Sequence, residues 1–153
     1  FDLNAFSGYL QYEGVSTSKG YELSSQYSLN DNWRLIANYT HNEAKRSDGS
    51  PRLRRPEELA NLGVSFNGLD ERLNLNAFYR ISRDSFDQVF GEPIVALEGF
   101  EVLDLTGSFN INDTFQVYGR VENATNEKYR EILGYNSAER AAYVGVKVNF
   151  TGF

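Results

Sequence analysis

The chain has 153 residues, 21 of them acidic and 15 basic, and its net charge of -6 and isoelectric point near 4.8 argue against nucleic acid as a partner. It contains no cysteine, which excludes a disulfide framework, a thiolate nucleophile and a cysteine-based zinc site. No apolar run approaches the roughly 18 consecutive residues that a membrane-spanning helix requires. Aromatic residues make up 14% of the chain, which indicates a folded protein rather than an acidic disordered one.

Apolar and polar residues alternate with a period of two along most of the chain. Near the C-terminus, for example, Val144, Val146 and Val148 alternate with Gly145 and Lys147. Successive side chains of a strand point to opposite faces, so this pattern predicts strands with one apolar and one polar face. Eight strands are expected, in chain order at residues 2–12, 18–30, 32–44, 57–67, 71–83, 100–111, 114–124 and 138–150.

The connections between these strands differ in length in a regular way. Three are short turns rich in Asn, Asp and Gly, at residues 30–32, 68–70 and 112–114. The others are longer and more polar, and lie around residues 14–17, 45–56, 84–99 and 125–137. Short turns at one end and long loops at the other are typical of an outer-membrane barrel.

Two architectures share this alternation, because a soluble barrel or sandwich buries its apolar face whereas a transmembrane barrel turns it toward lipid. The position of the aromatic residues favours the membrane, because amphipathic rings gather at both interfaces of a bilayer. At the short-turn end the apolar face is expected to carry Tyr27, Trp33, Phe66, Phe109, Phe115 and Phe150. At the other end it is expected to carry Tyr21, Tyr39, Tyr79 and Phe100.

The sequence offers little that resembles an active site. His41 is the single histidine, and no serine-containing nucleophile motif accompanies it, so a catalytic triad of the usual kind is implausible. Acidic residues of one long loop supply oxygen ligands of the kind that calcium prefers, but their spacing matches no known calcium loop. These residues are Asp84, Asp87, Glu92 and Glu98. We therefore expect no enzyme activity, no metal and no cofactor.

Four segments of the chain carry a family resemblance. The first three are residues 18–23 (SKGYEL), 53–56 (LRRP) and 103–105 (LDL). The fourth and longest begins at residues 119–123 (GRVEN) and ends at residues 143–150 (YVGVKVNF). In this order and spacing, residues 18–150 resemble the C-terminal barrel region of TonB-dependent outer-membrane receptors. The cobalamin-transporter branch, together with related siderophore receptors, is the most similar.

The resemblance implies an all-β fold, a transmembrane antiparallel up-and-down β-barrel, with residues 1–153 forming one barrel segment without a plug domain. Such receptors have 22 strands and a plug, so the chain is expected to be part of a larger barrel; the alternative is a small eight-stranded barrel. The absence of methionine also predicts that Phe1 is not a translation start.

The implied function is uptake of a large nutrient, such as cobalamin or a ferric siderophore, across the bacterial outer membrane. The implied partners are outer-membrane lipid and, during biogenesis, the barrel assembly machinery. TonB is an implied partner only through a plug that is absent from this chain. The alternative is a stand-alone outer-membrane barrel with a structural or adhesive role.

Two groups of residues are candidates for specific roles. The resemblance implies a barrel-assembly signal at Tyr143, Gly145, Val148 and Phe150, and Phe150 rather than Phe153 shares the parity of the lipid-facing residues. The long loops offer cations that could contact an anionic ligand or lipopolysaccharide phosphates. These are Arg52, Arg54, Arg55 and Arg130. The alternative is a solvated loop edge packed near acidic neighbours such as Glu57 and Glu58.

Overall fold

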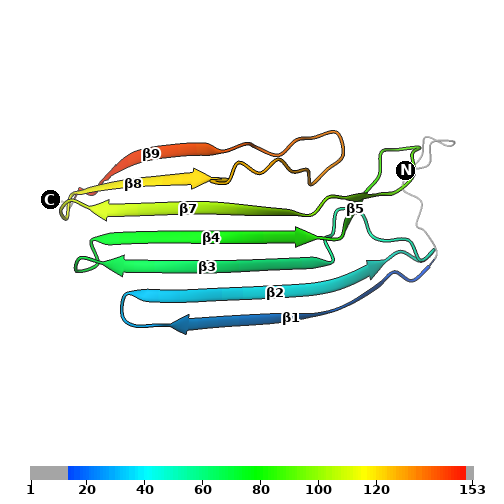
Figure 1. The fold of residues 1–153 in the computed structure, drawn as a ribbon, viewed down its shortest axis with the longest axis horizontal. Helices are drawn as coiled ribbons and strands as arrows, with labels where there is room; N and C mark the ends of the chain where they lie inside the picture. Colours follow the sequence, from blue (N-terminus) through cyan, green and yellow to red (C-terminus); the bar gives the residue numbers. More distant parts are fainter. Residues whose placement is uncertain (1–13, 151–153) are drawn as a thin grey trace.

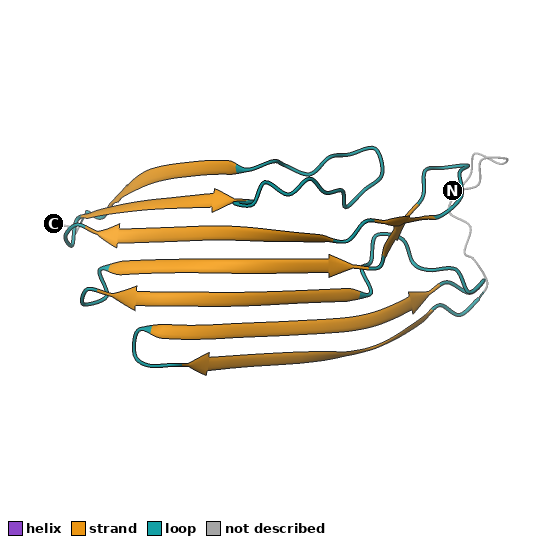
Figure 2. Ribbon diagram, viewed as in Figure 1, coloured by secondary structure: helices purple, strands orange, loops and turns teal. Residues whose placement is uncertain are grey.

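The computed structural model describes residues 14–150, and these residues form one antiparallel sheet of seven strands and a separate two-stranded ribbon (Figures 1 and 2). The order in the large sheet is β1-β2-β3-β4-β7-β8-β9, so every strand pairs with its neighbours along the sheet. The strands are β1 (Thr17–Ser28), β2 (Trp33–Lys45), β3 (Glu58–Gly68), β4 (Leu73–Arg83), β7 (Phe100–Asn110), β8 (Phe115–Glu122) and β9 (Ala141–Val148). The ribbon consists of β5 (Ser85–Asp87) and β6 (Val95–Leu97).

Seven of the eight predicted strands are present in the sheet, and the remaining one, at residues 2–12, lies outside the described residues. The last strand is shorter than expected at both ends, because β9 runs from Ala141 to Val148 instead of from residue 138 to residue 150. The prediction also missed β5 and β6, which are only three residues long each. Among the described residues there is no helix of the length and apolarity that a membrane crossing requires.

The register places apolar residues beside apolar residues across the whole sheet. One transverse row runs through Leu35, Val64, Ala77, Leu105 and Val121. The adjacent row on the opposite face is polar. It runs through Arg34, Ser65, Asn76, Thr106 and Arg120. Since side chains alternate along each strand, these two rows belong to two faces, one apolar and one polar.

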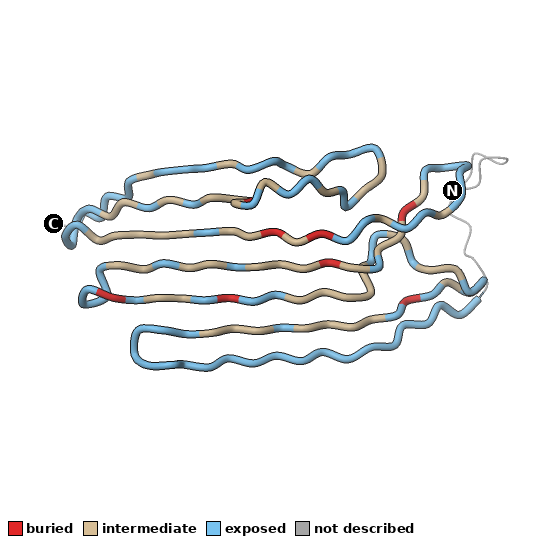
Figure 3. The backbone as a smooth tube through the Cα atoms, viewed as in Figure 1, coloured by how far each residue is buried: buried red, intermediate tan, exposed pale blue. Residues whose placement is uncertain are grey.

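The apolar face is not covered by a second layer. Leu62, Leu75 and Val146 remain 49%, 45% and 61% exposed, and Figure 3 shows β1 exposed along its whole length. A soluble sandwich would bury such side chains against another sheet, whereas a membrane barrel presents them to lipid. The described residues therefore have the all-β arrangement of a transmembrane barrel wall.

Aromatic pairs lie near both ends of the apolar face, as predicted. Trp33 and Phe66 are neighbours near the short turns, with ring centroids 4.7 Å apart, and Tyr21 lies 6.0 Å from Tyr39 near the other end. The prediction for Phe100 was wrong. The apolar residues of β7 have odd residue numbers, whereas Phe100 has an even one. Phe100 therefore lies on the polar face, where it is 5% exposed.

The barrel is not closed within residues 14–150. β1 and β9 lie at opposite edges of the sheet, and neither pairs with the other (Figure 1). The described residues thus form an open wall, and the small closed barrel considered as an alternative is not seen in them.

Candidate functional site

The three long connections gather at one end of the sheet, opposite the short turns (Figure 1). They are the β2–β3 connection (residues 46–57), the β4–β7 connection (residues 84–99, which includes the ribbon) and the β8–β9 connection (residues 123–140). We call these three segments the loop cluster.

The β8–β9 connection is folded on itself around Asn123, which is 3% exposed. The Asn123 side-chain amide donates to the carbonyl oxygens of Glu127, at 2.8 Å, and Ala138, at 3.2 Å. Its side-chain oxygen accepts a hydrogen bond from the Glu127 amide at 2.8 Å. Asn123 has a positive φ of 49°, a conformation that asparagine tolerates better than most residues. One side chain thus joins the two ends of this connection.

The same connection packs on the polar face of the sheet. The Tyr129 ring stacks on Phe100 with centroids 4.2 Å apart. The Arg80 guanidinium lies 5.2 Å from the centroid of the Phe100 ring and 3.1 Å from a Glu131 carboxylate oxygen. An aromatic stack, a cation–π contact and an ion pair therefore hold the middle of the β8–β9 connection against β4 and β7.

Asp87 joins all three connections of the loop cluster. It lies at the end of β5 and is fully buried, with 0% of its surface exposed. Its Oδ1 accepts from Arg54 Nε in the β2–β3 connection at 2.9 Å, and its Oδ2 accepts from the Leu133 amide in the β8–β9 connection at 2.8 Å. We call this set of contacts the Asp87 junction.

The pKa of Asp87 results from opposing effects. Burial raises it, but hydrogen bonds from the backbone amides of Leu133 and Gln88 and from Arg54 outweigh burial, so the pKa lies below its ordinary value. A carboxyl group with a lowered pKa in the folded state stabilises the fold above its unfolded pKa. That contribution is lost as the pH falls through the folded pKa.

We therefore expect the Asp87 junction to persist as the pH falls to about 4, the ordinary pKa of an aspartate, and to open only below it. Protection of the Leu133 amide from hydrogen exchange, corrected for the intrinsic pH dependence of exchange, measures this opening. The other charged groups near the junction are Arg54 and Glu131, which both line a small pocket. Loss of protection already above pH 5 would contradict the assignment.

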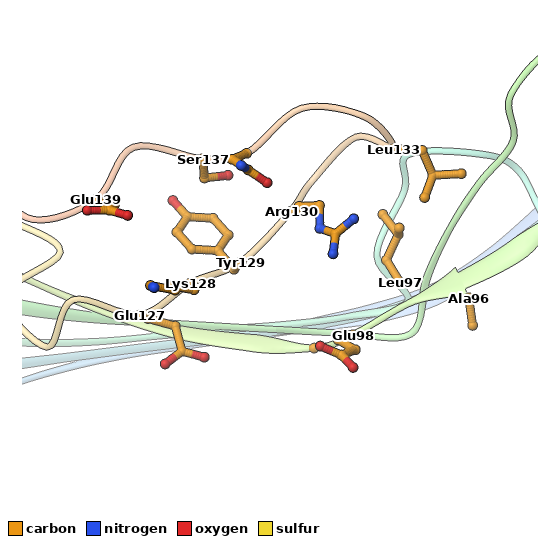
Figure 4. A pocket seen from close by; sticks show the side chains of 12 residues that line it. Ala96, Leu97, Glu98, Glu127, Lys128, Tyr129, Arg130, Leu133, Ser137 and Glu139 are labelled. Atoms are coloured by element: carbon orange, nitrogen blue, oxygen red, sulfur yellow. The ribbon is translucent and has the colours of Figure 1, made fainter.

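An open pocket of about 520 Å³ lies between the β4–β7 and β8–β9 connections (Figure 4). Figure 4 shows Leu97 and Glu98 on one side and Lys128, Tyr129 and Arg130 on the other. The lining contains two cations and three carboxylates, the last being Glu98, Glu127 and Glu139. This composition offers hydrogen-bond donors, acceptors and an aromatic ring, which suits a polar ligand of moderate size.

The four candidate arginines occupy different surroundings. Arg130 is exposed and lines the pocket, whereas the side chain of Arg54 is bound to Asp87 and lines a second pocket of about 240 Å³. Arg52 and Arg55 are exposed on the β2–β3 connection and line neither pocket. The sequence grouped these residues by charge, and the structure does not bring all four together; their contact with a ligand stays a prediction.

The candidate acidic loop residues do not form a metal site. Among residues 14–150, no group of three or more His, Asp or Glu side chains is placed to hold a metal ion. Of these residues, Asp87 has an arginine and a backbone amide as partners instead.

The residues of the expected assembly signal divide between the two faces of β9, the last strand of the sheet. Tyr143 and Gly145 lie on the polar face, where the Arg120 guanidinium is 4.4 Å from the centroid of the Tyr143 ring. Val148 has the apolar parity, and Phe150 beyond the strand is 88% exposed. Phe153 lies outside the described residues. Recognition by the assembly machinery stays a prediction.

Gly145 has a packing role that the sequence did not indicate. It pairs with Tyr118 of β8, and a Cβ added at Gly145 would lie 2.9 Å from Cε1 of the Tyr118 ring. An aromatic ring that covers a glycine of the neighbouring strand is a known way to stabilise a sheet. We expect Gly145→Val to destabilise the β8–β9 hairpin by about 1–3 kcal/mol through overpacking.

Adding Tyr118→Ala to Gly145→Val should restore most of this stability, because it frees the space that the new side chain needs. Urea unfolding in detergent micelles measures both variants. A double variant as unstable as the single one would show that Gly145 is required for a reason other than the Tyr118 ring.

The comparisons with known proteins agree with this geometry. The family model described as "TonB dependent receptor-like, beta-barrel" matches residues 2–124. No curated protein sequence matches the chain. Among solved structures, the ferripyoverdine receptor of the Pseudomonas aeruginosa outer membrane superposes with a TM-score of 0.74 at 20% identity, over 88% of this chain and 20% of the receptor.

Two further structures show the same similarity. The ferric-catecholate import receptor Fiu of Escherichia coli K12 has a TM-score of 0.75 at 23% identity, over 96% of this chain and 23% of Fiu. The siderophore receptor PiuA of Acinetobacter baumannii has a TM-score of 0.70 at 17% identity, over 88% of this chain and 22% of PiuA. The chain thus spans about a fifth of the length of these proteins, and at such identities the likeness shows the fold.

Proposed function

Because the chain belongs to the TonB-dependent receptor β-barrel family, we propose that it forms part of the barrel wall of an outer-membrane receptor that imports a ferric siderophore. The family is one of receptors in the bacterial outer membrane rather than of enzymes. The observation that carries the proposal is the match of the family model to residues 2–124, joined to a sheet with one uncovered apolar face.

The orientation of the wall follows from its connections. Outer-membrane barrels have short turns on the periplasmic side and longer loops outside the cell. The turns after β1, β3 and β7 are short, so their end of the sheet faces the periplasm in this proposal. The loop cluster then faces outward, where an incoming nutrient first meets the protein, and the pocket lined by Arg130 belongs to the ligand-receiving surface.

The cargo is argued from the relatives. The three receptors described above are named for ferripyoverdine, ferric catecholate and a siderophore. Ferric siderophores are often anionic, and Lys128 and Arg130 supply cations beside the aromatic ring of Tyr129. We therefore favour a ferric siderophore over cobalamin, which the sequence resemblance had also suggested. In this proposal the gating plug and the contact with TonB lie outside these 153 residues.

The test uses the intact protein in which this chain occurs, purified in detergent and titrated with ferric catecholate siderophores, ferric hydroxamate siderophores and cobalamin. We expect a ferric siderophore to bind, and uptake of the iron-55 complex by cells to require TonB. If cobalamin bound and no siderophore did, the proposed cargo would be wrong, but the assignment as a receptor for nutrient uptake would stand. A protein that spans the outer membrane and binds none of them would favour a structural or adhesive barrel instead.

A further inference from the structure

Asp87 is unusual in the loop cluster because it is a charged group without solvent contact. Its side chain is 0% exposed, whereas that of its partner Arg54 is 55% exposed. A buried carboxylate must have its oxygen atoms satisfied by hydrogen bonds or cations, because it has lost its hydration. Asp87 meets this requirement with a bond from Arg54 Nε to Oδ1 and a bond from the Leu133 amide to Oδ2, and the backbone amide of Gln88 also donates to the carboxylate.

The two bonds point to segments that are far apart in the sequence. Arg54 precedes Asp87 by 33 residues and Leu133 follows it by 46. Each bond joins a different connection to β5, and a bond from the Arg54 amide to the Phe86 carbonyl oxygen, at 2.7 Å, runs parallel to the first. Movement of either connection away from the ribbon would remove one of the two donors that reach this buried carboxylate from other connections.

The ribbon to which Asp87 belongs carries an exposed apolar tip. β5 pairs with β6, and the tip between them is closed by a bond from the Gln88 side chain to the Glu92 carbonyl oxygen at 2.6 Å. Phe90, at the tip, is 90% exposed. Asp87 pairs with Val95 in the last pair before the tip, so its bonds hold the end of the ribbon from which Phe90 projects.

We propose that Asp87 is a positioning residue that couples the three long connections, so that the loop cluster moves as one body and carries the Phe90 tip with it. Arg54 acts through Asp87 rather than on the β8–β9 connection directly, because its side-chain hydrogen bond ends on Oδ1 while the bond to Leu133 uses Oδ2. This inference concerns the conformation of the loops and does not depend on which ligand the protein imports.

The test compares Asp87→Asn, Arg54→Gln and a matched control, Asp84→Asn, in the intact protein by hydrogen-exchange mass spectrometry. Asp84 lies in the same connection, is exposed and has a positive φ of 54°, which asparagine tolerates, so it undergoes the same charge change without touching the junction. Asp87→Asn should speed exchange of the Leu133 amide about tenfold, as expected for loss of a hydrogen bond to a charged acceptor. Asp84→Asn should leave it unchanged.

Arg54→Gln is the decisive variant, because it removes a contact in one connection and is read out in another. Coupling predicts faster exchange at Leu133 in this variant as well, with unchanged protection of the β3–β4 amides as the folding control. Should Asp87→Asn fail to fold, Arg54→Gln alone supplies the answer. Unchanged exchange at Leu133 in Arg54→Gln would overturn the proposal, and so would equal effects of Asp84→Asn and Asp87→Asn.

Discussion

Leu62→Arg is expected to destabilise the protein by about 2–4 kcal/mol, the cost of an arginine on the lipid face near the bilayer midplane. Leu62 lies in the middle of β3, is 49% exposed and is flanked on the apolar face by Ala37 and Tyr79. In a membrane Ala37 offers no partner for a guanidinium and the Tyr79 ring offers only a cation–π contact, so the charge must still draw water inward or extend toward an interface. Urea unfolding in lipid vesicles, followed by heat-modifiable gel mobility, measures the loss.

Asn38→Arg is the matched control. Asn38 pairs with Asn61, the residue before Leu62, so the two substitutions lie at nearly the same depth but on opposite faces. Asn38 is exposed on the polar face, where water solvates a new guanidinium, and the expected change is below about 1 kcal/mol. Equal destabilisation by the two variants would show that the apolar face does not meet lipid.

Local sequence was sufficient to predict the large sheet, because each strand is long and its alternation has period two. It was not sufficient for the ribbon. β5 and β6 are three residues each within a polar connection, and such a run carries no distinct periodicity. Phe100 was predicted on the apolar face because it lies near the long-loop end of its strand. Leu103 lies on the apolar face, and Phe100, three residues before it, must lie on the opposite face because side chains alternate.

The site was predicted less well, because its contacts join residues that are remote in the chain. Arg54 is a loop cation like Arg52 in the sequence, and its bond to Asp87, 33 residues away, has no local signal. Asn123 follows the end of β8, and its role depends on a positive φ and on Ala138, which the sequence cannot bring near. Asparagine just after a strand was the one available hint of a sharp change of direction.

Arg130→Glu is expected to weaken binding of an anionic ferric siderophore about tenfold, or roughly 1.4 kcal/mol, if the ligand meets the pocket between the β4–β7 and β8–β9 connections. The lining now has two cations and three carboxylates, and the substitution leaves one cation and four carboxylates. Since Arg130 is exposed, most of the loss should appear as slower association with a weaker dependence on salt. Stopped-flow measurements of fluorescence quenching at several salt concentrations give both quantities.

The other arginines distinguish the pocket from general charge and from loop order. Arg52→Glu makes the same change in charge on an exposed residue that lines neither pocket, and it should alter affinity less than about threefold. Arg54→Gln should increase exchange at Leu133, which Arg130→Glu should not do, because Arg54 is bound to Asp87 and Arg130 is not among its partners. If Arg52→Glu weakened binding as much as Arg130→Glu, affinity would follow the net charge of the loop cluster, and the pocket would have no special part in capturing the ligand.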